Sequence, residues 1–580
     1  GSFTFKSLML IQMSGVISKS VCKTIIVIIA CLVSLSAAAQ IVPDAGSVQR
    51  EFNTPPPVLS PKVKSTLALE AKVLPGDPGA LIYVSEFIVA GVNLISGAAV
   101  TEALAPWLGR ELYFSELQVA LESINLLYAD KGWLARAQLP VQDIVDGRVF
   151  VEVIEARLGR LEIEANDQFP ISSKRVFNTL LAYIEASKTL NLDRLSQGLN
   201  LLNDLPGVEL QASLASGEQP GDVDVLLSSV VESRLNSSVL VDNWGHSSTG
   251  TERLSLNVNA NNPRHIGDQV SVNLMTSEAV RYGRLGYSVP VGYAGMRLFL
   301  GASQLDYRLI GSFAILASRG EADTLTVQLS KPIMSSKVAM INLALAYSSS
   351  RYLNEANAIV ISEKSLQVST LLLNGYWLGV GLNAGLTQWA LALSVGTLDL
   401  SANQENQLAD AASLQSAGNF EKLNLSVSHI KSLSRASTMI VSLAGQYANK
   451  NLDSSQKFSL GGPQGMRAYP TSEGAGDDGL MLNIEVEARV APQTKLSIFL
   501  DAGEVRLSKT LPVSNLIVPN KYSLVGWGLS ASHWFGQRSE LKLTVGRRIG
   551  GNPGASEISG NDNNGTLIEN RIWASWIVSI

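Results

Sequence analysis

Few residues in this sequence have the types and spacing that enzyme chemistry requires. The chain has no phosphate-binding loop of the form G-x-x-x-x-G-K-[ST], no HExxH zinc motif and no G-x-S-x-G nucleophile turn. No acid or nucleophile clusters in sequence around any of the four histidines, His246, His265, His429 and His533. The sequence therefore predicts a protein that is not an enzyme and that uses no metal or other cofactor.

One arginine and one aspartate instead stand in segments that suggest a specific contact. Arg467 lies in the glycine-rich segment 460–470, together with Gly465 and Tyr469. Asp501 lies between Phe499 and Gly503, on the polar side of a segment in which apolar and polar residues alternate. The two charges either form a latch between a loop and a strand or are two of many solvated charges. In contact with water such a pair contributes about 1 kcal/mol, and more only if it is desolvated.

The alternation around Asp501 continues over the last three-fifths of the chain. In residues 482–490, apolar residues alternate with Asn483, Glu485, Glu487 and Arg489. We count 16 such segments, often of ten or more residues, whereas strands in globular proteins average about five or six. A soluble sandwich would show the same alternation over shorter strands. The pattern favours a membrane β-barrel with lipid outside and water inside, in which Glu485, Glu487 and Arg489 face the lumen.

Composition is consistent with a barrel. Charged residues make up 16% of the chain and the mean hydropathy is +0.17, yet after residue 40 no run approaches the roughly 18–20 apolar residues of a membrane helix. The formal net charge of −5 argues against nucleic acid as a partner.

The connections between the segments alternate in length. With a first strand at 234–244, short turns fall at 293–294, 434–435, 491–493 and 536–538, and long loops at 450–476, 506–520 and 551–569. Short periplasmic turns and long surface loops are typical of outer-membrane barrels. The final strand, 570–580, carries Trp573 and Trp576, which we expect in an interfacial aromatic girdle.

The N-terminus has the pattern of a secretory signal peptide. Lysines precede an apolar run at 24–35, which ends in small residues before Gln40. We expect residues 1–39 to be removed, with Met13 as the start; both cysteines, Cys22 and Cys31, lie in this segment. Residues 40–80 read as a short helix near 45–52 followed by a linker rich in proline and small residues.

Residues 81–157 and 158–232 repeat one order of elements. The first segment reads as a strand at 81–90, helices at 98–108 and from an N-cap at Ser115, and strands at 136–144 and 148–157. The second reads as a strand at 159–165, helices at 173–183 and 192–204, and strands at 208–214 and 222–231. This predicts a tandem of two β-α-α-β-β units before the barrel at 233–580.

At these motifs the sequence resembles the two-partner secretion transporters, which export haemolysins and filamentous adhesins and belong with the BamA-like barrels. In that family a Val-Arg-Gly-Tyr loop folds into the lumen, and its arginine meets the aspartate of a Phe-x-Asp-x-Gly strand. The resemblance implies that Arg467 pairs with Asp501 and that Tyr469, Phe499, Gly503 and Gly465 frame the contact in an inward-folded loop 450–476. This chain has Met466 where the family has Val and Ala468 where it has Gly.

The resemblance extends to the two small units. Tyr128, Gly132, Pro140 and Gln142 match the first POTRA domain of the family (the polypeptide-transport-associated module), and Pro206 and Gly207 match the second. The resemblance implies that these two periplasmic domains bind the exported protein, and we take these six residues as candidates for that contact. It also implies that the helix near residues 45–52 plugs the barrel.

The expected fold is thus a membrane all-β domain combined with α+β units: a 16-stranded transmembrane barrel preceded by two POTRA domains and a plug helix. The implied function is an outer-membrane pore that exports a large unfolded partner, recognised by its N-terminal secretion domain, without ATP. Activation of that partner is left open. Other expected partners are outer-membrane lipid and the barrel assembly machinery; Trp576, Val578 and Ile580 keep the spacing of its recognition signal, without its terminal aromatic residue. The alternatives are a BamA-like insertase and a diffusion porin.

Overall fold

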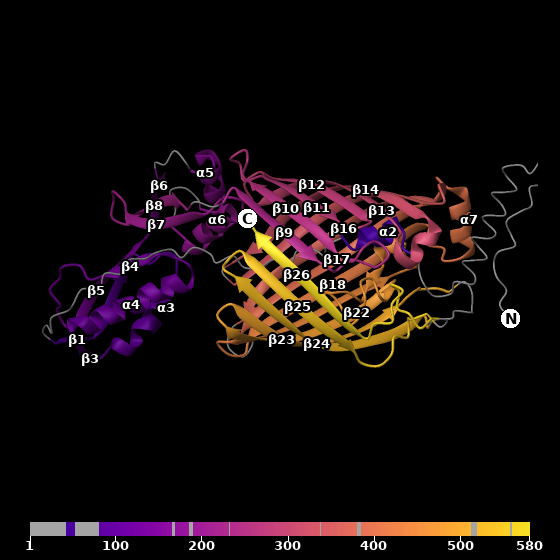
Figure 1. Ribbon diagram of the computed structural model, residues 1–580. Helices are drawn as coiled ribbons and strands as arrows, with labels where there is room; N and C mark the ends of the chain where they lie inside the picture. The colour runs from indigo at the N-terminus through magenta and orange to yellow at the C-terminus, as the bar shows by residue number, and fades with distance from the viewer. Residues whose placement is uncertain are drawn as a thin grey trace, which may run out of the picture.

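A computed structural model describes residues 42–52, 81–164, 169–184, 189–230, 233–336, 338–379, 384–511, 519–556 and 559–580. A barrel forms one end of the molecule and two small α/β units lie side by side at the other end (Figure 1). The expected signal peptide 1–39, with Met13, Cys22 and Cys31, lies outside the described residues, as do the linker 53–80 and Gln40. Within the described residues, no helix is long and apolar enough to span a membrane.

The barrel closes on itself, and each strand pairs with its neighbours in chain order until the last strand meets the first. This confirms the predicted 16-stranded barrel. The strands are β9 (Leu235–Asp242), β10 (Arg253–Asn261), β11 (Gln269–Thr276), β12 (Val280–Val291), β13 (Met296–Arg308), β14 (Ser318–Ser335), β15 (Ala339–Ala356), β16 (Ile359–Gly379), β17 (Gly385–Asp399), β18 (Gly418–Ser432), β19 (Ser437–Ala448), β22 (Asp478–Ala491), β23 (Thr494–Arg506), β24 (Lys521–Phe535), β25 (Ser539–Arg548) and β26 (Asn570–Ser579).

The sequence alternation becomes two faces of the barrel wall. In β24, Trp527 and Leu529 are exposed on the outside while Ser530 and Ser532 are buried on the inside. Because successive side chains of a strand point to opposite faces, one set of alternate residues, largely apolar, lies on the outer side, and the other set, largely polar, faces the interior.

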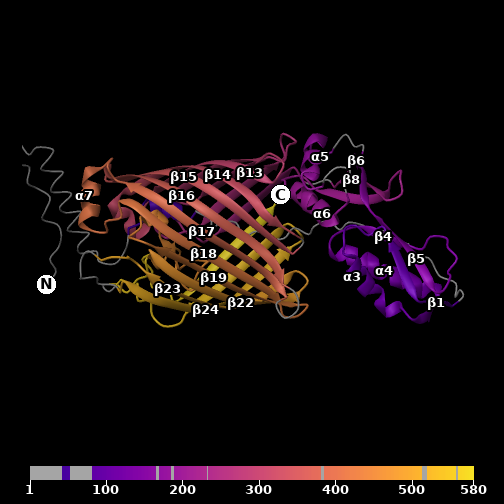
Figure 2. The same ribbon diagram turned by 180° about the vertical axis from the view of Figure 1, so that it is seen from behind.

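Connection lengths divide the barrel into two ends. The short turns fall at 292–295, 433–436, 492–493 and 536–538, as predicted, at the end that carries the two small units (Figure 2). The longest connections, 400–417, 449–477 and 549–569, are at the opposite end, where helix α7 (Gln404–Ala412) also lies. The small units therefore lie at the end that is periplasmic in an outer-membrane barrel.

The first small unit contains α3 (Gly97–Leu104), α4 (Phe114–Asp130) and the sheet β2-β5-β4, formed by β2 (Glu86–Ala90), β5 (Arg148–Glu155) and β4 (Ala135–Gln138). The predicted strand 81–90 is interrupted at Ser85, and its first part, β1 (Ile82–Val84), pairs with β3 (Arg110–Leu112). Helix α4 begins two residues earlier than predicted, because its N-cap residue is Tyr113 and not Ser115; the Glu116 carboxylate accepts from the Tyr113 N–H. The predicted strand 136–144 ends at Gln138, since Pro140 has no N–H to donate.

The second unit has the same topology. Strand β6 (Arg157–Ile163) lies parallel to the central strand β8 (Asp222–Ser229), and β7 (Leu210–Ser216) lies antiparallel on its other side. Helices α5 (Ser173–Leu181) and α6 (Leu192–Asn203) contribute Val176, Leu180, Leu195, Leu199 and Leu202 to one buried cluster with the sheet. The predicted repeat is thus two copies of one small fold, each with its own core.

Candidate functional site inside the barrel

The connection between β19 and β22, residues 449–477, folds back into the barrel, and we call it the inward loop. Two short strands, β20 (Phe458–Ser459) and β21 (Ala475–Gly476), pair at its base. Four of its side chains, Leu460, Met466, Ala468 and Tyr469, are completely buried against the barrel wall. The loop is therefore held by apolar packing as well as by its charges.

Arg467 of this loop meets Asp501 of β23. Nη2 of Arg467 lies 2.8 Å from Oδ1 of Asp501, and Nε lies 3.1 Å from Oδ2. The backbone N–H of Arg467 also donates to Oδ2, at 3.0 Å. The Asp501 side chain has no exposed surface and that of Arg467 is 9% exposed. The expectation of a wet contact was wrong: in a desolvated pair, loss of one partner costs about 3–5 kcal/mol because the other charge stays buried.

Three further groups complete the surroundings of the pair. The carboxylate of Glu485 accepts a second hydrogen bond from the Arg467 guanidinium. The ring of Phe499 lies under that guanidinium, 3.5 Å from Cζ to the ring centroid. Asn483 donates to Asp501 Oδ1 at 2.8 Å and to the carbonyl of Gly465 at 3.0 Å. Glu485, expected only as a lumenal charge, thus belongs to this site, and Asn483 was not anticipated.

Trp573 corrects a second expectation. Its side chain is 7% exposed, and its indole Nε1–H donates to the carbonyl of Arg467 at 2.7 Å. It therefore faces the inward loop instead of an interfacial girdle, because residue 573 falls on the inner side of β26. Trp576 is 50% exposed on the outer side, where a girdle residue would lie.

The small residues of the two motifs are required by close contacts. A Cβ at Gly465 would lie 2.2 Å from the carbonyl oxygen of Leu460, and one at Gly503 would lie 2.7 Å from Leu460 Cδ2. Ala468 does not have a positive φ, so its Cβ causes no backbone strain. The departure from the family's glycine at position 468 therefore fits this loop. The neighbouring Tyr469 donates its hydroxyl to the carbonyl of Val525, at 3.0 Å.

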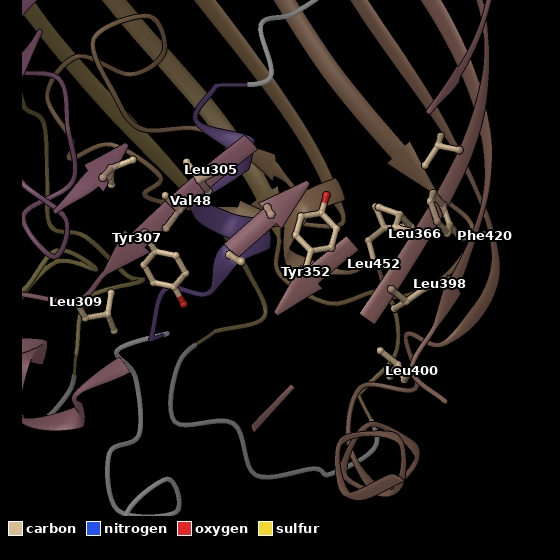
Figure 3. Packing of buried hydrophobic residues seen from close by; sticks show 14 of the residues in the cluster. Val48, Leu305, Tyr307, Leu309, Tyr352, Leu366, Leu398, Leu400, Phe420 and Leu452 are labelled. Atoms are coloured by element: carbon tan, nitrogen blue, oxygen red, sulfur yellow. The ribbon is translucent and has the colours of Figure 1, made fainter. Parts of the chain in front are cut away.

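Helix α2 (Ala45–Arg50) occupies the barrel interior beside the inward loop, and we call it the lumenal helix (Figure 1). Asp44 and Ser47 cap its N-terminus reciprocally. Ala45 and Val48 pack into an apolar cluster with wall residues that include Leu305, Tyr307 and Tyr352 (Figure 3). The interior at this level is therefore packed and not filled with water.

A buried lysine joins the lumenal helix, the inward loop and the wall. Nζ of Lys364, on β16, lies 2.8 Å from Oδ2 of Asp44 and 2.5 Å from Oδ2 of Asp453. Arg50 adds a link between helix and loop through the carbonyl of Ser454, at 2.7 Å. The sequence carries no signal for this cluster, because its charges are ordinary ones from three distant segments.

Comparison with known proteins now identifies the family. The model of the haemolysin secretion/activation protein family ShlB/FhaC/HecB matches residues 221–531, which is more than half of the chain. The chain belongs to this family. A model of the ShlB-type POTRA domain also matches residues 82–156, the first small unit.

Individual relatives share 25–28% of their residues with this chain over the matched regions. The heme/hemopexin transporter protein HuxB of Haemophilus influenzae is 28% identical over 439 residues, 74% of this chain and 77% of the relative. The outer membrane transporter CdiB of Dickeya dadantii is 25% identical over 393 residues, 65% and 67% of the two chains. The predicted outer-membrane location and the predicted role as a pore that exports a partner protein are confirmed.

Solved structures show the same fold. CdiB from Escherichia coli superposes with a TM-score of 0.66 at 19% identity, over 98% of this chain and 100% of the other. BamA from Haemophilus ducreyi lacking POTRA domains 1–3 has a TM-score of 0.51 at 13% identity, over 86% and 100%. At these identities the likeness concerns the fold alone.

The candidate client contacts in the POTRA units have structural roles. Tyr128 is completely buried and donates to Glu155 at 2.8 Å, so it is not available to a client. Both glycines have positive φ angles. Gly132, with a φ of +75°, lies beside Asp193 of the second unit. Gly207, which follows Pro206 and has a φ of +69°, packs on the barrel turn at Asn261 and Asn262.

Gln142 serves the hairpin between β4 and β5. Its side-chain amide donates to the carbonyl of Phe150 at 2.8 Å and accepts from the Phe150 N–H at 2.7 Å. It thereby supplies the hydrogen bonds that β4 no longer provides once Pro140 ends the strand. Of the four candidates in the first unit, Tyr128 and Gly132 are buried, and Pro140 and Gln142 lie beside the fully exposed Val141.

The remaining lumenal candidates lie nearer the periplasmic turn between β22 and β23. Glu487 pairs with Lys495 at 3.4 Å, with both side chains partly exposed. Arg489 is exposed at the end of β22. Among the residues that the structure describes, neither side chain pairs with the inward loop, so only Glu485 of these three charges belongs to the site.

We predict that Asp501→Asn releases the inward loop far more than Glu485→Gln. Asp501 is fully buried and receives three hydrogen bonds from Arg467, whereas Glu485 is 14% exposed and receives one. Loss of the Asp501 charge should lower the free energy of loop opening by about 3–5 kcal/mol, and loss of the Glu485 charge by about 1.5–3 kcal/mol. Hydrogen exchange of the backbone amides of residues 460–470 measures this opening. Equal exchange in both variants would contradict the assigned order.

Proposed function

We propose that this protein exports one large partner protein, in unfolded form, through the lumen of its barrel. The observation that supports this proposal is that two separate segments, the lumenal helix and the inward loop, close a barrel that would otherwise be an aqueous pore. Both are held by side chains and not by covalent links. A closure of this kind suits a pore that opens for a client and is otherwise shut.

The lumenal helix is the first obstacle on this path. It buries only two apolar side chains deeply, Ala45 and Val48, and its remaining anchors are polar. We propose that it leaves the lumen during export, with residues 54–80 as its tether. The POTRA units receive the client in the periplasm, where a free sheet edge can add an extended segment through backbone hydrogen bonds.

Folding of the client outside the cell supplies the direction of transport. A folded domain is typically stable by about 5–15 kcal/mol and cannot return through the barrel. HuxB, named as a heme/hemopexin transporter, and CdiB, named as an outer membrane transporter, are consistent with export. For this chain we propose a client of the large, secreted class that carries an N-terminal secretion domain; the assembly machinery and lipid act during insertion.

The two alternatives have less support. An insertase of the BamA type shares the barrel fold, but the family match is to the secretion proteins. A diffusion porin would leave the two POTRA units without a role, and its lumen would not be filled by a helix and a loop.

We predict that deletion of the gene removes one large protein from the culture medium, and that Arg467→Ala or Asp501→Ala restores this secretion only in part. Each variant leaves a buried charge without its partner, so the loop loses its position while the barrel still inserts. Immunoblots of medium and outer-membrane fractions measure secretion and insertion separately. Glu504→Ala is the matched control, because this carboxylate lies on the same strand but its pair with Lys521 is half exposed. Normal secretion by both variants would remove the latch from the mechanism.

We also predict that closure of the pore depends on pH through Glu51, at the end of the lumenal helix. Burial, which outweighs the attraction of Arg253 and Arg50, raises its pKa to about 7. In the free helix the carboxyl has an ordinary pKa near 4.5, so the docked helix binds the proton more tightly between these values. Docking must then strengthen as the pH falls through this window and weaken as it rises toward 7.

Ion currents through the protein in planar lipid bilayers test this dependence. The open fraction should be higher at pH 8 than at pH 5, and Glu51→Gln should flatten the change. His246, which lines the same cavity, stays neutral in this range because burial lowers its pKa to about 4. Glu473 also lines the cavity and burial raises its pKa, so Glu473→Gln serves as the comparison. A pH response that survives in Glu51→Gln and disappears in Glu473→Gln would assign it to the loop.

A further inference from the structure

The cluster around Lys364 contains one buried cation and two carboxylates that belong to different segments. Asp44 belongs to the lumenal helix, Asp453 to the inward loop, and Lys364 to the barrel wall. The side chains of Lys364 and Asp453 are 5% and 8% exposed. The helix therefore contributes only one of the two counterions of this lysine.

The Asp453 carboxylate is held by hydrogen bonds from within the inward loop. Its Oδ1 accepts hydrogen bonds from the backbone N–H of Ser455 at 3.0 Å and from the Ser455 hydroxyl at 2.7 Å. Its Oδ2 remains directed at Lys364. If the lumenal helix withdraws, this carboxylate stays within reach of the ammonium group.

The two carboxylates consequently have opposite effects on release of the helix. A buried ammonium group without a counterion is strongly unfavourable. When the helix leaves, Asp44 takes its charge away, and Asp453 determines whether Lys364 is left unpaired. Asp44 stabilises the closed state, whereas Asp453 stabilises the lysine in the open state.

We propose that Asp453 is a positioning residue for export: it retains Lys364 as an ion pair while Asp44 departs, and so makes the anchor of the lumenal helix reversible. The inference rests on the proposed function, in which the helix vacates the lumen. Two aspartates that contact the same nitrogen atom thus have opposite roles.

Two isosteric substitutions separate this role from a merely structural one. Asp44→Asn keeps the helix cap, since Asn caps helices as well as Asp does, but it weakens the pair with Lys364. Asp453→Asn keeps an oxygen acceptor for Ser455 but removes one of the two carboxylates that pair with Lys364, so that Asp44 remains as its counterion. A purely structural cluster would loosen in both variants.

The experiment measures the open probability of the purified full-length chain in planar lipid bilayers. We expect Asp44→Asn to raise the open-to-closed ratio about tenfold, the scale of one hydrogen bond to a charged group, and Asp453→Asn to lower it. Asp453→Glu, which keeps the charge, should return the ratio toward that of the unmodified chain. In Lys364→Met, the effect of Asp44→Asn should shrink to the part that comes from the Ser454 hydroxyl, which also donates to Asp44.

Deletion of residues 42–52 distinguishes the inference from the proposed function on which it rests. If this deletion opens the channel while both aspartate variants shift the ratio in one direction, the role of Asp453 is overturned and the plug remains. If the deletion leaves the currents unchanged, the helix does not close the pore, and both proposals are overturned. Circular dichroism of each variant confirms that the barrel has folded before its currents are compared.

Discussion

The desolvated pair between Arg467 and Asp501 is the interaction on which the interior of this barrel depends. An aspartate without exposed surface in a barrel wall requires a compensating charge, and the inward loop supplies it. The guanidinium in turn is satisfied by Glu485 and by the ring of Phe499. The loop therefore cannot leave the lumen without breaking the ion pair and its three hydrogen bonds, and this constraint fixes its position.

Through this pair the inward loop also reaches the strands that close the barrel. The ladder between β26 and β9 contains five residue pairs, fewer than any other neighbouring pair in the barrel. The carbonyl of Arg467 accepts from Trp573 of β26, and Thr471 donates to the carbonyl of Trp244, which follows β9, each at 2.7 Å. The loop thus contacts both sides of the shortest ladder from the inside, and its position and the closure of the barrel support one another.

The sequence predicted those features that repeat or that form a motif. Alternation over 16 long segments predicts the barrel, because a wall with lipid outside and water inside requires apolar and polar residues in turn along each strand. The pairing of Arg467 with Asp501 came from a resemblance, and the structure brings the two residues together. The burial of the pair was not predictable, since it depends on how Leu460, Met466 and Tyr469 pack around it.

Contacts between distant segments account for most of what the sequence left out. Lys364, Asp44 and Asp453 are ordinary charges in their own segments, and only the closed barrel places them together. Trp573 and Trp576 are three positions apart on β26, so they lie on opposite faces of the strand. The sequence shows this spacing, but it does not show that Trp573 has a hydrogen-bond partner on the inner face. Tyr128 and Gln142 matched a family motif because the fold requires them, so a motif match did not by itself indicate a binding surface.

The two closing segments are held with unequal strength, and the reason is their composition. The inward loop buries Leu460, Met466, Ala468 and Tyr469 completely. This apolar surface would become exposed to water if the loop moved, which is unfavourable. The lumenal helix has six residues and depends chiefly on hydrogen bonds and ion pairs, which water replaces at a small net cost. An anchor of exchangeable contacts suits a segment that must leave and return. The helix is therefore the weaker closure, and in the export cycle proposed above the loop keeps its position when the helix leaves.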